Sequence, residues 1–141
     1  MIARLICSFA CIGMIVISGC ATKDVFMPRS EYPPDPWVKG YADKDDCLGG
    51  EKLAAMNFVL PDYPRRSFNS GRQGWVIMRL DVNTAGQTEN VTVERSVPEG
   101  LFEKASRQAV EAWTFAPPAD GALQNCRVLL RFRAGKVSLG G

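Results

Sequence analysis

The chain has 141 residues, 46% hydrophobic and 23% charged, a composition that allows one small globular domain. Its formal net charge of +2 gives no reason to expect nucleic acid as a partner. Histidine is absent, and no Gly-rich phosphate motif or spaced metal-ligand set is present, so we expect no enzyme activity, no metal and no cofactor.

Residues 1–19 are predicted to be an export signal. Arg4 precedes a run of 18 uncharged residues, 5–22, that ends before Lys23. The run contains Ile17-Ser18-Gly19-Cys20, which resembles the lipobox of bacterial lipoproteins. This resemblance implies cleavage before Cys20 and lipid on its thiol. The alternative is an uncleaved membrane helix, because 18 residues lie at the lower limit for a span.

The cysteines are consistent with export. Cys7 and Cys11 would leave with the signal, and Cys20 would carry lipid, so Cys47 and Cys126 remain. In an exported protein, one remaining cysteine pair predicts a disulfide. A bond between Cys47 and Cys126 would close a loop of about 80 residues and stabilise the fold by roughly 4 kcal/mol. The alternative is two buried free thiols.

Residues 20–60 are predicted to be a lipid-anchored tether. Four prolines stand among charged residues between Ala21 and Asp46, which favours extended chain. Fully extended, that stretch would reach about 85 Å. Trp37 and Tyr41 are candidates to dock on the domain, and Glu51–Asn57 is predicted to form a short helix.

The folded domain is predicted to span residues 61–141. Tyr63-Pro64 precedes a short helix, Arg65–Ser70, which Gly71 ends. A strand follows at Trp75–Val82. One face of this strand is apolar at every second residue, namely Val76, Met78, Leu80 and Val82. Trp75 lies on the other face, where either the tether covers it or a partner does.

Three more elements complete the domain. A turn with Gly86 leads to a second strand, Glu89–Arg95. Apolar residues then recur every three or four positions from Leu101 to Trp113, which predicts an amphipathic helix. The last strand is Cys126–Ala134. One of its faces carries Arg127, Leu129, Arg131 and Arg133.

These elements predict an α+β fold with a three-stranded antiparallel sheet, packed by one main helix and a short N-terminal helix. Placing the last strand beside the first makes every pairing antiparallel, in the order second, first, last (2-1-3). The last strand is then an exposed edge, and its Arg127, Leu129, Arg131 and Arg133 become the predicted partner-binding residues. A row of charges on an edge also protects against aggregation, and this reading is compatible with attraction of an acidic partner.

The stretch from Tyr63 to Pro118 resembles the C-terminal domain of the TonB energy transducers. The family pattern consists of Tyr-Pro, Gly before the first strand, a Gly-containing turn, Ser-x-Pro after the second strand, and Trp-x-Phe-x-Pro after the helix. In this chain the matching residues are Tyr63, Pro64, Gly71, Gly74, Gly86, Ser96, Pro98, Trp113, Phe115 and Pro117. The resemblance implies a βαβ sandwich that binds a short extended peptide of an outer-membrane receptor by strand addition.

Two features differ from a typical transducer: the N-terminal segment looks cleavable, and the Pro-rich stretch is short. We therefore predict a lipid-anchored periplasmic module that engages an outer-membrane receptor or another envelope protein in TonB-dependent transport. Two alternatives remain: a structural envelope lipoprotein that dimerises or braces an assembly, and a true transducer with an uncleaved membrane helix. Ala21, rather than Asp, after Cys20 favours the outer membrane, as the lipoprotein resemblance implies.

Overall fold

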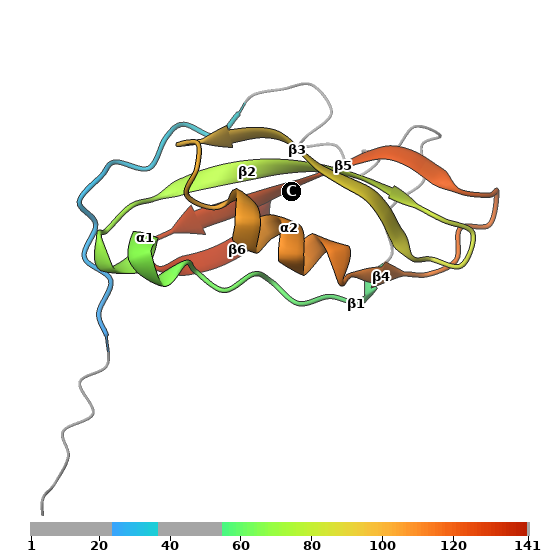
Figure 1. Ribbon diagram of the computed structural model, residues 1–141, viewed down its shortest axis with the longest axis horizontal. Coiled ribbons are helices and arrows are strands. Elements are labelled where there is room, and N and C mark those ends of the chain that lie inside the picture. The colour runs from blue at the N-terminus through green and yellow to red at the C-terminus, as the bar shows by residue number, and fades with distance from the viewer. Residues whose placement is uncertain (1–23, 37–54, 141) are drawn as a thin grey trace, which may run out of the picture.

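A computed structural model of the chain describes residues 24–36 and 55–140 (Figure 1). The described strands form a four-stranded antiparallel sheet, β3-β2-β5-β6, and a two-stranded sheet, β1-β4. The elements are β1 Ala55–Asn57, α1 Arg65–Asn69, β2 Gly74–Val82, β3 Thr88–Val97, α2 Glu103–Glu111, β4 Thr114–Phe115, β5 Leu123–Arg133 and β6 Lys136–Gly140. In Figure 1, α2 lies across one face of the large sheet and α1 lies near one of its ends.

The predicted strand order is confirmed for β3, β2 and β5, which pair antiparallel as expected. The prediction of three strands is wrong, because β6 pairs with β5 from Leu129↔Gly140 to Arg133↔Lys136. The turn between them is Ala134 and Gly135, with φ values of 50° and 74°. Two residues with positive φ form the hairpin turn whose twist matches that of the flanking strands.

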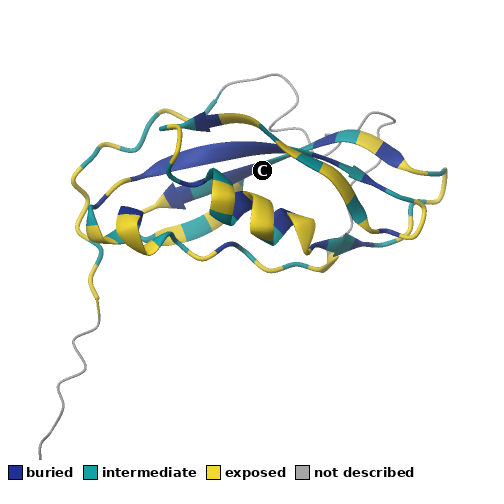
Figure 2. Ribbon diagram, viewed as in Figure 1, coloured by how far each residue is buried: buried dark blue, intermediate teal, exposed yellow. Residues whose placement is uncertain are grey.

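The main core lies between the sheet and α2. The predicted apolar face of β2 is buried there, with Val76, Met78, Leu80 and Val82 fully inaccessible. Phe102, just before α2, stacks on Phe132 of β5 with ring centroids 4.4 Å apart. Figure 2 shows β2 buried along most of its length, while the outward side of α2 is exposed.

The small sheet was not expected. Ala55 of β1 pairs with Phe115 of β4, and Asn57 pairs with Thr114. The predicted helix over Glu51–Asn57 is therefore wrong for the part that the structure describes. The pairing with β4 satisfies backbone groups of β1 that an isolated three-residue segment would leave to water.

The short helix α1 confirms the prediction, and it ends in a turn at Gly71. Gly71 has φ of +62°, and an added Cβ would lie 2.0 Å from the carbonyl oxygen of Met27. Its own carbonyl oxygen accepts hydrogen bonds from the backbone N–H groups of Arg29 and Ser30, at 2.9 and 3.3 Å. The N-terminal segment therefore packs directly on this turn.

Residues 24–36, which we call the strap, run from α1, where Phe26 packs, to the face of the sheet opposite α2, which their later part covers. Trp75 and Ile77 of β2 and Leu129 of β5 form a second buried cluster there, against which Tyr32 packs. The indole N–H of Trp75 donates to the carbonyl oxygen of Pro34 at 2.9 Å. Of the two readings of Trp75, cover by the tether is the correct one. Trp37 and Tyr41, the residues expected to dock, lie outside the described residues.

We predict that Gly74→Ala destabilises the domain by about 1–3 kcal/mol, the usual range for overpacking. A Cβ at Gly74 would lie 2.1 Å from the carbonyl oxygen of Val97 and 2.7 Å from Cδ of Pro98, so β2 and β3 would have to move apart. Urea unfolding measures the change. Gly100→Ala is the comparison variant for steric overlap. Its added Cβ meets no atom within 4 Å, so any loss of stability there comes from the positive φ of +81° alone. A Gly74→Ala protein as stable as wild type would contradict the close packing.

Candidate partner-binding edge

The predicted partner-binding residues do not lie on an edge strand. In β5, Arg131 has Trp75 of β2 as its register partner on one side and Ser138 of β6 on the other. Leu129 likewise lies between Ile77 and Gly140. The assignment of Leu129, Arg131 and Arg133 to a free edge is therefore wrong, because β6 occupies the expected position of the guest strand.

The side chains of these residues face the strap side of the sheet. Leu129 is buried, whereas the three arginines interact with groups far away in sequence. Arg127 contacts Glu94 at 2.9 Å, and Arg131 contacts Asp35 of the strap at 3.0 Å. The guanidinium of Arg133 lies 5.2 Å from the ring centroid of Tyr32.

Asp35 and Tyr32 link the strap to β5 electrostatically. The Tyr32 hydroxyl donates to Asp35 Oδ1 at 2.7 Å, and Arg131 Nε donates to Oδ2 at 3.0 Å. Partial burial would raise the pKa of Asp35, but the two hydrogen bonds and the nearby arginines lower it overall. Burial and the Asp35 carboxylate raise the pKa of Tyr32. Asp35 therefore remains charged, and its ion pair is kept, well into the acidic range.

The described edge beyond β5 is β6. Its five register pairs with β5 run without a shift. Gly140 packs against Leu129, whose side chain would lie 2.6–2.9 Å from an added Cβ, and Val137 packs on the main core. Leu139 is 40% exposed. β6 is thus held on the domain by its pairing with β5 and by the contacts of Gly140 and Val137. Its outer side faces no described strand.

Tyr63 and Pro64 stand at the junction of α1 with the core. The ring of Tyr63 contacts those of Phe102 and Phe132 edge to face, at centroid distances of 5.7 and 5.6 Å. Its hydroxyl donates to the carbonyl oxygen of Arg72 at 2.5 Å, and burial raises its pKa to about 12. Pro64 precedes α1, and its carbonyl oxygen accepts the first hydrogen bond of the helix, from Phe68.

The remaining family residues hold loops against the core. Gly86 has no room for a side chain, because a Cβ would lie 2.0 Å from the carbonyl oxygen of Phe115. The indole N–H of Trp113 donates to the carbonyl oxygen of Val59 at 2.8 Å, and the side chain is buried. Phe115 is also buried, and Pro117 is exposed after β4.

Ser96 lies near the end of β3 and Pro98 lies in the loop between β3 and α2, and Glu103 joins the strand end to this loop. Its carboxylate accepts hydrogen bonds from the Ser96 hydroxyl and from the backbone N–H groups of Gly100 and Phe102, the last at 3.0 Å. Burial would raise the pKa of Glu103, but these hydrogen bonds lower it overall. Sequence reasoning missed this residue, although a Glu near the start of a helix is a known capping signal.

Gln73 was also missed, and it joins three parts of the fold. It is buried, and its side-chain amide donates to the carbonyl oxygen of Ser30 at 2.8 Å. Its Oε1 accepts from the N–H of Ala134, in the β5–β6 turn, at 2.8 Å. The strap, the start of β2 and the start of the edge hairpin therefore share one polar side chain.

Cys126 is fully buried in the core. Cys20 and Cys47 lie outside the described residues, so lipidation and the Cys47–Cys126 disulfide stay predictions. Within the described ranges, no group of three or more His, Cys, Asp or Glu residues could hold a metal. Nor is any helix of these ranges long and apolar enough to cross a membrane.

Residues 59–133 match the family described as the Gram-negative bacterial TonB protein C-terminal. The chain belongs to this family. The TonB protein of Xanthomonas campestris pv. campestris (strain B100) is 35% identical over 63 residues, which are 45% of this chain and 28% of that protein. The TonB protein of Pseudomonas aeruginosa is 33% identical over 74 residues, 52% of this chain and 22% of that protein. The match therefore spans less than a third of these TonB proteins.

Solved structures of TonB domains share the fold. The solution NMR structure of the Pseudomonas aeruginosa TonB CTD aligns with a TM-score of 0.50 and 26% identity, covering 63% of this chain and 93% of that one. A structure of the TonB2 protein from Vibrio anguillarum aligns with a TM-score of 0.51 and 24% identity, covering 74% and 99%. The resemblance read from the motif is thus confirmed for the TonB C-terminal domain.

We predict that Glu103→Gln lowers stability at neutral pH and that the deficit shrinks in acid. The folded-state pKa of Glu103 lies below its ordinary value of 4.5, so the carboxylate stabilises the fold above that pH. This contribution is lost as the pH falls through the folded pKa. Urea midpoints of both proteins at pH 7 and pH 3 measure the gap. A gap that stays constant across this range would contradict the assigned role.

Proposed function

We propose that this chain is a membrane-anchored TonB-like binding module that takes up an extended peptide by β-strand addition. The peptide belongs to an outer-membrane receptor, or to another envelope protein, in TonB-dependent transport. Family membership supports the general role. The observation that carries the binding mode is that the described part of the large sheet ends in β6, a regular strand with no described strand outside it.

The opposite edge, β3, is a poorer platform. Its register with β2 shifts twice, between Ile77 and Met78 and between Arg79 and Asp81, and Asn90 has φ of +51°. Bulges bend an edge strand and interrupt the row of backbone groups that a guest strand would need. β6 shows no such shift. The β6 edge is therefore the one that supports strand addition.

Backbone alternation allows a sharp test. The pair beside a two-residue hairpin turn, Arg133 and Lys136, exchanges hydrogen bonds, so we expect the N–H of Ser138 to point to β5 and that of Leu139 to point outward. Leu139→Pro then removes an outward donor while leaving the β5–β6 pairing intact. Ser138→Pro weakens that pairing instead.

We predict that peptides from receptor N-terminal segments bind the wild-type protein and that the two proline variants distinguish the two possible modes of strand addition. If the peptide adds outside β6, Leu139→Pro abolishes binding because the outward N–H is lost. If the peptide takes the place of β6, Ser138→Pro strengthens binding because β6 is displaced more easily. Isothermal titration with matched urea midpoints gives the affinities and the folding control.

Either pattern supports strand addition, whereas unchanged affinity in both variants contradicts it. If no peptide binds and the wild-type protein sediments as a tight dimer, the structural role through pairing of two copies replaces the receptor role.

Anchoring is the second part of the proposal. We place a diacylglycerol-modified Cys20 at the mature N-terminus, in the outer membrane, and a disulfide between Cys47 and Cys126. The lipobox-like Ile17-Ser18-Gly19-Cys20 supports the first assignment, and export of a chain with one remaining cysteine pair supports the second.

We predict that the membrane-extracted protein begins at an acylated Cys20. Mass spectrometry of the N-terminal peptide measures this, and Cys20→Ser is the control, because it should accumulate as the uncleaved form. A mature protein that keeps Met1–Gly19 would instead favour a transducer with an N-terminal membrane helix.

A further inference from the structure

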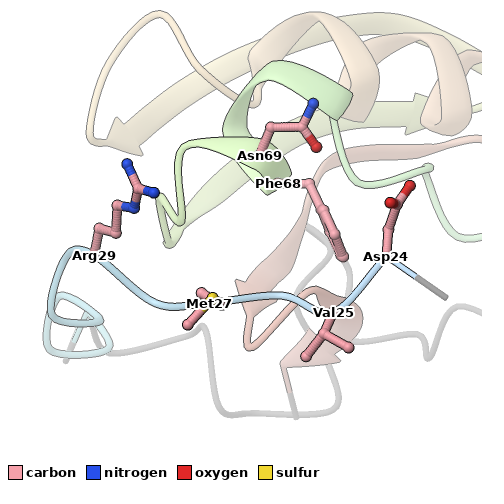
Figure 3. Close-up of a pocket in the computed structure, with 6 residues that line it drawn as sticks. All are labelled: Asp24, Val25, Met27, Arg29, Phe68 and Asn69. Atoms are coloured by element: carbon pink, nitrogen blue, oxygen red, sulfur yellow. The ribbon is translucent and has the colours of Figure 1, made fainter. Parts of the chain in front are cut away.

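The first residues of the strap present an apolar surface. Phe26 points inward and contacts Tyr63 and Phe68, at centroid distances of 5.5 and 5.3 Å. Its neighbours Val25 and Met27 are 78% and 70% exposed. Figure 3 shows both beside α1, where they line a shallow pocket with Phe68 and Asn69. Two large apolar side chains are thus left in solvent at the strap pole, the end of the domain where the strap meets α1.

The strap pole is also where the chain connects to its predicted anchor. Asp24 is the fourth residue after Cys20, so the connection spans at most about 14 Å. β5, with 11 residues, is about 36 Å long and runs from the opposite end of the domain to the strap pole. The described fold therefore begins next to the anchor, and the 85 Å reach of a free tether is not available.

The strap is held by specific contacts along its length. Ser30 accepts two hydrogen bonds from Gln73: its hydroxyl oxygen accepts from the backbone N–H at 3.1 Å, and its carbonyl oxygen accepts from the side-chain amide at 2.8 Å. Pro34 and Asp35 add the bonds to Trp75 and Arg131. Releasing the strap would expose the cluster around Trp75, so an undocked tether is disfavoured.

Charge at the strap pole suits a phospholipid surface. Arg29 on the strap and Arg65 and Arg66 of α1 are exposed, whereas the acidic residues of these two segments are Asp24, Glu31 and Asp35, all on the strap, the last paired with Arg131. A basic side chain close to an anionic membrane contributes about 1 kcal/mol of attraction. Val25 and Met27 add apolar area that an interface can bury.

We propose that the strap seats the domain on the membrane that carries its anchor, with Val25 and Met27 against phospholipid. With the lipid anchor in the outer membrane, as proposed above, its outer-membrane partner is then engaged at that same membrane. This inference rests on the membrane attachment proposed above. It holds for either form of attachment, because the lipidated Cys20 and the alternative uncleaved helix both leave the membrane before Lys23.

The test uses the full chain in vesicles of phosphatidylethanolamine and phosphatidylglycerol. A fluorophore is placed through Asn69→Cys at the strap pole or through Asp120→Cys at the opposite end, both exposed positions. The chain without an introduced cysteine is the labelling control. Headgroup-quencher lipids should cause a several-fold loss of intensity at position 69 and little loss at position 120. Equal quenching at both positions would overturn the inference.

Two variants test separately the docking of the strap on the domain and the contact of Val25 and Met27 with lipid. Gly71→Ala should abolish the difference between positions 69 and 120, because its Cβ would overlap the carbonyl oxygen of Met27. Gly100→Ala shares a positive φ but meets no atom within 4 Å, and should keep the difference. The double variant Val25→Ser, Met27→Ser should fold normally and lose quenching at position 69. Full quenching in the double variant would overturn the apolar contact.

The outcome is separable from peptide binding. A protein that binds receptor peptides yet shows equal quenching at both positions overturns only the seating on the membrane. A protein with the expected quenching that binds no peptide overturns only the strand-addition function. A chain that is not recovered with membranes overturns both the anchoring and this inference.

Discussion

The whole structure depends on β2 being buried on both faces. Its even-numbered side chains from Val76 to Val82 lie under α2, and Trp75 and Ile77 lie on the opposite face. A strand with two apolar faces needs cover on both, and one helix can supply only one of them. The strap supplies the other, which makes residues 24–36 part of the folded unit even though the family match begins at residue 59. Cover by a Pro-rich segment is efficient, because proline restricts the unfolded chain and so reduces the entropy lost on docking.

The turn at Gly71 to Gln73 connects this second layer to the β6 edge. Gly71 receives the strap on its backbone, and Gln73 bridges Ser30 to Ala134 at the start of the β5–β6 hairpin. Phe26 packs from the strap against the same hairpin turn, where Gly135 leaves it room. The position of β6 and the docking of the strap are therefore mechanically linked. A substitution that displaces the strap is therefore expected to shift β6 as well, through these contacts.

The alternation of apolar and polar residues, together with the turn residues, was enough to predict β2, β3, β5 and their order. In each of these strands, apolar residues at every second position mark the buried face. The fourth strand was missed because Ala134-Gly135 lacks the Asn-Gly or Asp-Gly signature of a two-residue turn. β1 and β4 were missed because two or three residues carry no period, and their pairing is decided by distant packing around Trp113. The arginine row of β5 was recognised, but its partners, Glu94 and Asp35, lie 33 and 96 residues away. Composition alone could not distinguish a docked strap from a free tether.

The direction of the strands constrains how a partner could approach. β5 runs toward the strap pole, and β6 starts there and runs away, since the Ala134-Gly135 turn packs on Phe26. A peptide added antiparallel outside β6 would run toward the strap pole, so the chain that follows it would continue toward the membrane beneath. An N-terminal segment that precedes a body embedded in that membrane has this polarity. A peptide that replaced β6, antiparallel to β5, would run the opposite way and send its following chain away from the membrane. If the strap seats the domain as proposed, a receptor in the same membrane therefore favours addition outside β6 over replacement of it.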